Sequence, residues 1–431
     1  MGEKKEEYLE EAELIRMRSL LRHVFTPSSP VSELSLFSGR YDQIDQVLDA
    51  VSNRGQHAII YGERGVGKTS LATLTYDLWN AVKKDYDLFP LHITCDTSDT
   101  FQSLWFKISE DMRVEFDKRG ISFPTNSQVF TKALHDIEHS YANPNSIRRF
   151  FDLLGKEFII TIDEFDRLQR DDEQTGMALF ADTIKTLSDQ AVPVTLIIVG
   201  VADSVDQLLR EHLSISRALV QVQMPRMSQA ELIGIAEKGY DRIGIAVDPA
   251  ALDAIAALAQ GLPHYAHVLA LHAAEHAARD KRAKVVAKDV VAALQRALDQ
   301  AHEDIVNSYT RATTASRQHI YEEVLLACAL TDTDPRGFFA AVDVQAPMCR
   351  IMKRPYKSPS FARHLNDFCS DRHGEVLHAE GEKHKVRYRF VNPLLKPYAL
   401  HRGLLSGLID MTEVKALEVL TPAARRRLKQ P

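Results

Sequence analysis

Apolar residues follow two different patterns along this chain, and the change between them divides the sequence. Between residues 57 and 224, short continuously apolar runs alternate with longer amphipathic stretches. Runs that are apolar at every position are typical of parallel strands covered on both faces. The alternation of strands and helices predicts a doubly wound α/β sheet. The five expected strands are Ala58–Tyr61, Leu91–Cys95, Phe158–Ile162, Val194–Val199 and Leu219–Met224.

After the fifth strand the pattern changes. Between residues 228 and 300, apolar residues recur three and four positions apart, which is the spacing of amphipathic helices. Ser228 and Asp248 are suitable N-cap residues, and Gly261 followed by Pro263 is a typical stop and restart signal. This stretch therefore predicts a small all-helical unit.

A third pattern begins after the polar segment 303–317. One helix is predicted near 318–330 and another near 359–370, with prolines and glycines interrupting the stretch between them. Two strand-like runs, Glu375–Ala379 and Lys385–Val391, follow and are joined by a polar turn. Helices followed by a β-ribbon are the element order of a winged helix.

Composition adds a few exclusions. The chain has 431 residues, 45% apolar and 26% charged, as in ordinary globular proteins. It has no run of 18 apolar residues and no apolar secretory core at its N-terminus, so we expect a cytoplasmic protein without a membrane partner. The four cysteines are scattered singly, which indicates reduced thiols rather than a disulfide framework or a metal site.

Charge is distributed unevenly. The net charge is −6, yet residues 317–431 contain 19 basic and 13 acidic side chains and so carry +6, which leaves −12 on the remainder. A basic C-terminal third on an acidic body favours contact with a polyanion there.

The sequence YGERGVGKTS, residues 61–70, introduces specific chemistry. Gly62, Gly67, Lys68 and Thr69 fit the phosphate-loop pattern G-x-x-x-x-G-K-[ST], between a predicted strand and a predicted helix. In such a loop, backbone amides surround the phosphates, the lysine reaches the β- and γ-phosphates, and the hydroxyl holds Mg²⁺. The expected nucleotide-binding residues here are Gly62, Glu63, Arg64, Gly65, Val66, Gly67, Lys68, Thr69 and Ser70.

A second motif, FIITIDEFDRL at residues 158–168, complements this loop. A buried strand that ends in Asp163 and Glu164 provides the acidic groups that phosphate-loop enzymes require. Asp163 would hold Mg²⁺ together with Thr69, and Glu164 would orient or deprotonate the attacking water. Lys68 and Glu164 are therefore predicted catalytic residues, and ATP with Mg²⁺ is the predicted cofactor set.

With these motifs, the chain resembles the AAA+ ATPases, most closely their initiator branch of the origin-recognition-complex type and related prokaryotic ATPases. The resemblance extends from about Phe37 to Leu404. It is carried by FSGRYDQIDQVLDAV, VGVADSVDQL, SISRALVQVQM and GLPHYAHVLALHAAEHA. It implies a phosphate-loop sheet, a helical lid and a C-terminal winged-helix domain that binds DNA.

The resemblance also implies roles for single residues. It places Arg40 near adenine and makes Arg217 an arginine finger acting on the nucleotide of a neighbouring subunit; the alternative for Arg217 is a salt-bridged surface residue. Where sensor 1 is often Asn, this chain has Asp203 or Ser204, and where sensor 2 usually carries Arg it has His264. A neutral imidazole has no permanent charge, so we expect slow hydrolysis, unless His264 is a lid-surface residue without a role.

The C-terminal third carries the candidate DNA contacts. In its last predicted strand, Lys385, Arg387 and Arg389 alternate onto one face. A basic ribbon beside a basic helix suits duplex phosphates, although the interspersed acidic residues are compatible with a protein-binding surface instead. The candidate DNA-binding residues are Arg363, Lys383, Lys385, Arg387 and Arg389.

Three functions fit these features. The first is a DNA-binding AAA+ homo-oligomer that slowly hydrolyses ATP at its subunit interfaces. The second is a STAND-type switch in which the winged helix locks the nucleotide, and the third is an ATPase subunit, for example of a bacterial defence system, that acts on a protein effector. The predicted domains are a helical arm (1–30), an α/β nucleotide-binding domain (31–226), a helical lid (227–302), a winged helix (303–406) and a basic tail (407–431).

Overall fold

The computed structural model describes most of the chain. The described residues are 11–27, 37–82, 88–168, 175–202, 215, 217–314, 320–334, 336–381 and 385–415. The predicted sensor residues Asp203 and Ser204 and the predicted DNA contact Lys383 lie outside them.

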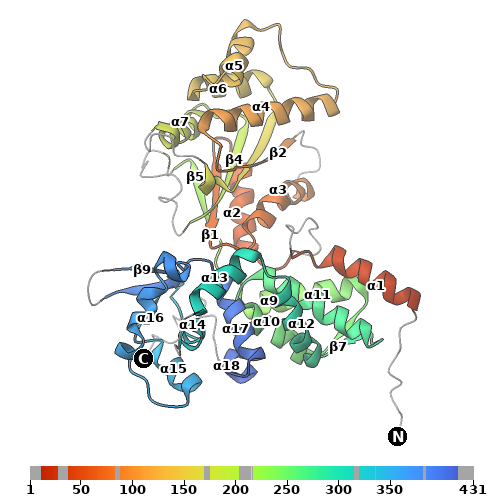
Figure 1. The fold of residues 1–431 in the computed structure, drawn as a ribbon. Helices are drawn as coiled ribbons and strands as arrows, with labels where there is room; N and C mark the ends of the chain where they lie inside the picture. Colours follow the sequence, from red (N-terminus) through yellow and green to blue (C-terminus); the bar gives the residue numbers. More distant parts are fainter. Residues whose placement is uncertain are drawn as a thin grey trace, which may run out of the picture.

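A five-stranded parallel sheet forms the core of the upper half of the molecule in Figure 1. Its strands are β1 (His57–Gly62), β2 (Leu88–Thr94), β3 (Glu157–Asp163), β4 (Val194–Val201) and β5 (Leu219–Gln223). The order across the sheet is β2-β3-β4-β1-β5, and every neighbouring pair is parallel. The predicted α/β sheet is therefore confirmed. β2 also includes Pro90, which an edge strand tolerates because one side of its backbone needs no partner.

Helices cover both faces of this sheet (Figure 1). One face packs against α2 (Tyr41–Ser52) and α3 (Lys68–Val82), and the other against α4 (Phe101–Lys118), α5 (Gln128–Glu138), α6 (Pro144–Leu154) and α7 (Thr175–Asp189). Because successive strand residues point to opposite faces, Ile59 and Ile60 belong to two separate hydrophobic cores. The core beneath α4 to α7 stays within the upper half, whereas the other core continues into the lower half.

The lid (residues 227–302) lies below the sheet. It contains α9 (Gln229–Ile243), α10 (Pro249–Ala259), α11 (Pro263–Arg279), α12 (Ala287–Asp299) and the two-residue strands β6 (Ala246–Val247) and β7 (Lys284–Val285). The N-terminal helix α1 (Glu11–Val24) packs on α9 and α11. Phe25, just after α1, stands edge-on to Tyr240 with ring centroids 5.2 Å apart, and a side chain at Gly239 would collide with it. The described part of the predicted arm, residues 11–27, thus packs into the core of the lid.

The C-terminal region (residues 303–415) is mainly helical with a small sheet. Its elements are α13 (Glu303–Thr313), α14 (Tyr321–Ala329), β8 (Phe339–Ala340), α15 (Gln345–Met352), α16 (Ala362–Asp367), β9 (Leu377–Glu380), β10 (Arg387–Phe390), α17 (Leu395–Leu405) and α18 (Met411–Lys415). The sheet is antiparallel, in the order β8-β10-β9. The segment read as a polar connector is helix α13, and the helix expected near 359–370 is reduced to six-residue α16 between two 3-10 turns.

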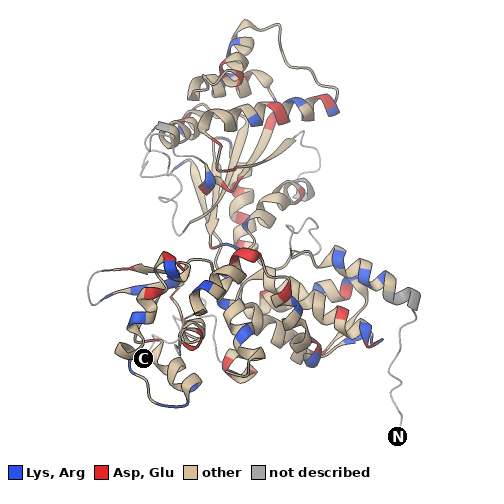
Figure 2. Ribbon diagram, in the orientation of Figure 1, with Lys and Arg blue, Asp and Glu red and all other residues tan. Residues whose placement is uncertain are grey.

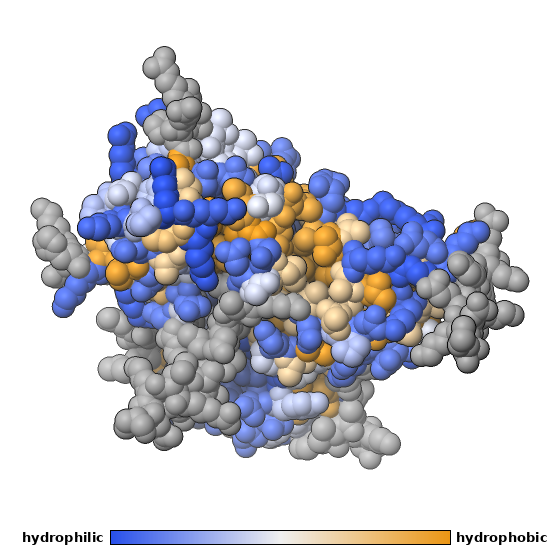
Figure 3. Space-filling model, turned by 90° about the horizontal axis from the view of Figure 1, so that it is seen from below, coloured by the Kyte–Doolittle hydropathy of each residue, from blue (hydrophilic) through white to orange (hydrophobic). Residues whose placement is uncertain are grey.

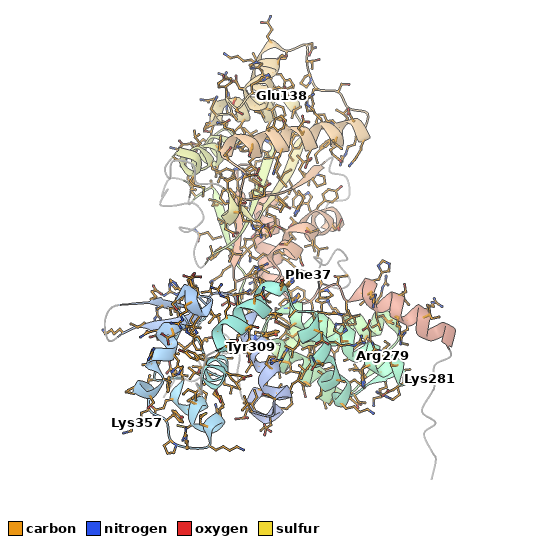
Figure 4. The ribbon with its side chains drawn as sticks, in the orientation of Figure 1. Phe37, Glu138, Arg279, Lys281, Tyr309 and Lys357 are labelled. Carbon is orange, nitrogen blue, oxygen red and sulfur yellow. The ribbon has the colours of Figure 1, made fainter. Side chains whose placement is uncertain are left out.

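The lid and the C-terminal region share one hydrophobic core. Helix α17 contacts α10 and α12, and α18 contacts α10. Tyr309 of α13 lies between these parts (Figure 4), with its ring centroid 5.2 Å from that of Tyr398 on α17 and its hydroxyl donating to Glu322 of α14 at 2.9 Å. Phe37, labelled at the junction with the sheet, accepts a hydrogen bond at its backbone oxygen from Lys238 of α9 (2.6 Å).

The lower face of the molecule is seen directly in Figure 3. Apolar surface lies near its centre, and hydrophilic residues surround it. Within the described residues, every helix is too short or too polar to pass through a bilayer.

Candidate functional site

The loop between β1 and α3 has the backbone that a phosphate-binding loop needs. Gly62, Gly65 and Gly67 all adopt positive φ (150°, 85° and 95°), which side-chain-bearing residues rarely do. A side chain at Gly62 would also collide with the backbone oxygen of Met224. Helix α3 begins at Lys68, so the loop leads directly into a helix N-terminus, whose backbone N–H groups and dipole favour an anion.

Lys68 is folded back onto its own loop. Its Nζ donates to the backbone oxygens of Gly62 (3.1 Å) and Glu63 (2.8 Å), and only 8% of the residue is exposed. Burial lowers the pKa of Lys68 to about 8, with the carboxylates of Asp166, Asp163 and Glu63 acting in the opposite direction. An anion beside this ammonium would offset its desolvation.

The acidic residues lie at the carboxyl end of β3. Asp163 is buried and its Oδ1 accepts from the backbone N–H of Glu164 (2.8 Å). Glu164 adopts the left-handed conformation (φ 53°), and its carboxylate lies 3.0 Å from Arg167 Nη1. The neighbouring Asp166 accepts a hydrogen bond from Val201 N at the end of β4 (2.8 Å), which joins the two strand ends.

One cavity of about 650 Å³ brings these groups together. Its wall contains most of the predicted nucleotide and metal residues, including Lys68, Thr69, Asp163 and Glu164. Other lining residues were not predicted as site residues, although several of them lie within the sequence stretches that carry the motifs and the resemblance. They are Thr26, Pro27, Thr94, Asp166, Arg167, Gly200, Val201, Pro263, His267, His302 and Leu394.

Histidines of the lid line the far wall of this nucleotide cavity. His264 lies there as predicted, and its Nδ1 is 2.9 Å from the backbone oxygen of Pro27, so the lid touches the N-terminal arm at the cavity. Burial lowers the pKa of His264 and lowers that of His267 to about 4, so both rings are neutral at pH 7. Nδ1 of His267 is buried without a hydrogen-bond partner in the described part of the chain.

Arg40 lies behind the phosphate loop rather than in the cavity wall. Its guanidinium donates to the backbone oxygens of Pro225 (2.6 Å) and Val66 (3.3 Å). The backbone N–H of Arg40 donates to the side chain of Glu231 on α9 (3.3 Å). Arg40 is buried, which lowers its pKa. It therefore ties the phosphate loop to the end of β5 and to the lid, and its contact with adenine remains a prediction.

Arg217 lies on the surface, away from the nucleotide cavity of its own chain. Its side chain is 74% exposed and its Nη2 is 2.6 Å from Asp189 at the end of α7. It is not among the residues that line the cavity. This position agrees with either of the two roles considered for it, a finger acting on another chain or a surface ion pair.

The candidate DNA contacts do not form one free basic face. Arg363 on α16 is 88% exposed and 3.6 Å from Asp367, and Lys385 is exposed. Arg387 is paired with Asp334 (3.0 Å) and Glu380 (3.7 Å). The guanidinium groups of Arg387 and Arg389 both lie over the Phe338 ring, about 5 Å from its centroid. Basic and acidic residues alternate along the ribbon of this region in Figure 2.

The C-terminal region also reaches the phosphate loop. Leu394 lines the nucleotide cavity, and a Cβ atom at Gly65 would lie 3.1 Å from its side chain. The hydroxyl of Tyr265 on α11 donates to the backbone oxygen of Leu394 (2.8 Å) and fixes this segment to the lid. Glu63 of the loop is ion-paired with Arg226 (2.8 Å), which also donates to Gln260 of the lid (3.1 Å).

The loop, the buried aspartate and the lid together define a P-loop NTPase of the AAA+ type. A family model described as Novel STAND NTPase 1 matches residues 30–339. Because this match covers most of the chain, the protein belongs to that family. The prediction of a P-loop enzyme related to the AAA+ ATPases is confirmed. No curated protein matches the sequence.

Archaeal proteins are among the solved structures that this chain resembles. The Walker-type ATPase of Pyrococcus abyssi is 16% identical, with 86% of this chain and 98% of that chain covered and a TM-score of 0.50. The ORC1 protein of Aeropyrum pernix, solved in complex with DNA, is 17% identical over 91% of this chain and 98% of that chain, with a TM-score of 0.48. The ORC2 protein of the same organism is 14% identical over 90% and 98%, with a TM-score of 0.49. At these identities the likeness concerns the fold.

Proposed function

We propose that this protein is an ATP-hydrolysing switch whose C-terminal region, a winged helix with its following helices, closes over the bound nucleotide. The single observation that carries this proposal is the position of Leu394, which belongs to the C-terminal region yet lines the nucleotide cavity beside Gly65. A nucleotide held there would leave only when this segment and the lid move. Membership of a STAND NTPase family supports the same function.

The residues in the cavity fit ATP and Mg²⁺. The amides of the loop from Gly62 to Ser70 and the ammonium of Lys68 would bind the phosphates. The hydroxyl of Thr69 and the carboxylate of Asp163 would hold Mg²⁺, which neutralises charge on the phosphates when bound. Lys68 makes hydrogen bonds only to carbonyl oxygens in the described structure, so a phosphate would give its charge a better partner.

Glu164 is the group proposed to orient the attacking water. In this structure its carboxylate is held by Arg167 at 3.0 Å. We infer that the conformation described here is a resting state, because a carboxylate that is ion-paired with an arginine is not free to accept a hydrogen bond from the attacking water. Turning Glu164 away from Arg167 would then be part of activation.

Activation is proposed to include assembly of several chains. Arg217 lies outside the nucleotide cavity of its own chain, so it can act as a finger only on the cavity of a neighbour. An oligomer with ATP at its interfaces would satisfy this geometry.

The rate of ADP release tests the proposed switch. Leu394→Ala should release a fluorescent ADP analogue on the order of tenfold faster than the wild type, because removing a buried leucine weakens the contact that closes the cavity. Leu405→Ala, at a half-exposed position on α17, is the matched control and should leave release unchanged. Thermal melting of both variants checks that they fold. Equal release rates in the two variants would refute the switch.

A second candidate function is binding of duplex DNA. The element order α14-β8-α15-α16-β9-β10 with a three-stranded antiparallel sheet supports a winged helix, and Arg363 and Lys385 are exposed on it. DNA-stimulated ATP hydrolysis would support this function, whereas the same rate with and without duplex would favour a protein effector.

A further inference from the structure

A second cavity adjoins the phosphate loop where the C-terminal region meets it. Its volume is about 310 Å³, and it is lined by the loop, the end of β4, the residue preceding the lid and two segments of the C-terminal region. It shares Arg64 and Val201 with the nucleotide cavity but contains none of Lys68, Thr69 and Asp163. The groups that would bind the nucleotide phosphates and Mg²⁺ are therefore not part of it.

The wall of this second cavity is strongly basic. Five basic side chains line it against a single carboxylate. The basic residues are Arg64, Arg226, Arg336, Arg389 and Lys396, and the acidic one is Glu63. Glu63 is already paired with Arg226 at 2.8 Å, and Arg64 lies 3.9 Å from Asp304 outside the cavity. The pairing within the wall leaves an excess of positive charge facing the cavity.

Lys396 is the buried part of this wall. It is 6% exposed, and its Nζ donates to the backbone oxygen of Thr331 at 3.3 Å, its one hydrogen-bond partner in the described part of the chain. An ammonium can donate three hydrogen bonds, so two are unused. Burial and the nearby Arg226 lower the pKa of Lys396 to about 7, against the opposite influence of Asp332 and Glu63. A buried cation with one neutral partner is costly unless an anion joins it.

Two arginines of the same wall, Arg336 and Arg389, lie against one aromatic ring. Arg336 lies over Phe338 with its guanidinium carbon 5.8 Å from the ring centroid, and Arg389 lies over the same ring at 4.9 Å. A Cβ atom at Gly337, which has φ 79°, would lie 3.2 Å from Glu63 of the phosphate loop. The turn therefore lies close against the loop, and the stacking limits the orientations of both guanidinium groups.

We propose that this cavity binds a small phosphorylated compound, held by cationic side chains from both the nucleotide-binding and the C-terminal parts of the molecule. Its volume lies at the lower end of the range of small-ligand sites, and planar guanidinium groups bind phosphate in a two-pronged manner. Such a ligand would hold the C-terminal region against the phosphate loop. This consequence for regulation, unlike the binding itself, rests on the proposed switch function.

Pyrophosphate is the probe for this site. The full-length protein is saturated with ADP and Mg²⁺ and then titrated with pyrophosphate by calorimetry, while a fluorescent ADP analogue reports any displacement from the nucleotide cavity. One further site per chain is expected, with ADP retained. Arg336→Gln should weaken pyrophosphate binding on the order of tenfold, the effect of losing one charge-assisted hydrogen bond. Arg372→Gln, another exposed arginine of the same region but outside the cavity, should leave it unchanged.

A second variant tests the buried end of the site. Lys396→Met removes the charge at similar volume and should abolish pyrophosphate binding while ADP binding persists. The proposal is overturned by the absence of a second site in the ADP-saturated protein, by displacement of ADP by pyrophosphate, or by unchanged binding in both variants. A protein that does not bind ADP would refute only the proposed switch, because the same variants then test this cavity by titration without nucleotide.

Discussion

The two sides of the nucleotide cavity are built in different ways. On the phosphate side, the loop residues between 64 and 70 and the end of β3 supply the predicted groups that line the cavity. On the opposite side, the wall comes from the N-terminal arm, two parts of the lid and Leu394, which are far apart in the sequence. The phosphate side forms wherever the strand-loop-helix unit forms, whereas the opposite side exists only when three parts of the molecule pack together. The groups that would bind the phosphates are thus determined by a short stretch of sequence, whereas the opening of the cavity is determined by tertiary packing.

This comparison predicts that loss of a single group on the phosphate side is enough to abolish nucleotide binding. Lys68→Ala should abolish detectable ATP binding and hydrolysis, because no other described ammonium lines the nucleotide cavity. Calorimetric titration with ATP and Mg²⁺ measures this effect. Lys185→Ala, at an exposed position on α7, is the matched control. Binding by Lys68→Ala close to that of the wild type would mean that the loop does not hold the phosphates.

On the phosphate side, a single substitution should also slow ATP hydrolysis without preventing ATP binding. Glu164→Gln should keep ATP binding and reduce turnover about 10²- to 10⁴-fold, since the amide cannot act as a base. Phosphate release under saturating ATP measures the loss. Arg167→Gln removes the ion pair that holds Glu164 and should not slow turnover. Equal turnover in Glu164→Gln and wild type would contradict the assignment of this carboxylate.

A third test asks whether a neighbouring chain completes the site. Arg217→Ala should bind ATP normally and hydrolyse it about 10³-fold more slowly, at the lower end of arginine-finger effects. Mixing it with Lys68→Ala should partly restore hydrolysis, because each variant supplies the group that the other lacks. Asp189→Asn breaks the same surface ion pair but keeps the arginine, so it should hydrolyse ATP normally. Without rescue at any mixing ratio, Arg217 is a structural residue.

The smallest expected effect concerns binding of DNA by the C-terminal region. If the C-terminal region binds duplex phosphates, the logarithm of the affinity should fall with the logarithm of salt concentration by about 0.9 per phosphate neutralised. Replacing the exposed Arg363 and Lys385 by alanine should reduce this slope by about two units. Arg387→Ala should change it less, because Asp334 and Glu380 already occupy that guanidinium. Fluorescence anisotropy at four salt concentrations measures the slopes, and no binding at low salt would exclude DNA.

The same difference between the two sides of the nucleotide cavity explains which features could be predicted from the sequence. The five strands were predicted because buried parallel strands are apolar at every position, and the phosphate loop because its glycines have a fixed spacing. Leu394, in the turn just before α17, and His267, on α11, could not be found in this way, since a leucine and a histidine at such positions look like ordinary core residues. The alternation that predicted Arg387 and Arg389 on one face was correct, with Tyr388 and Phe390 buried. It could not reveal that Phe338, on another segment, lies beneath both arginines.

The shared core of the lid and the C-terminal region has a consequence for how signals pass through the molecule. Helix α17 packs on α10 and α12, which in turn pack on α11, so a partner that moved the C-terminal region together with this shared core would also move the wall that carries His264 and His267. Partner and nucleotide are then thermodynamically linked: whatever factor the partner applies to nucleotide affinity, the nucleotide must apply to partner affinity. The nucleotide state of the protein would therefore set the concentration at which its partner is recognised.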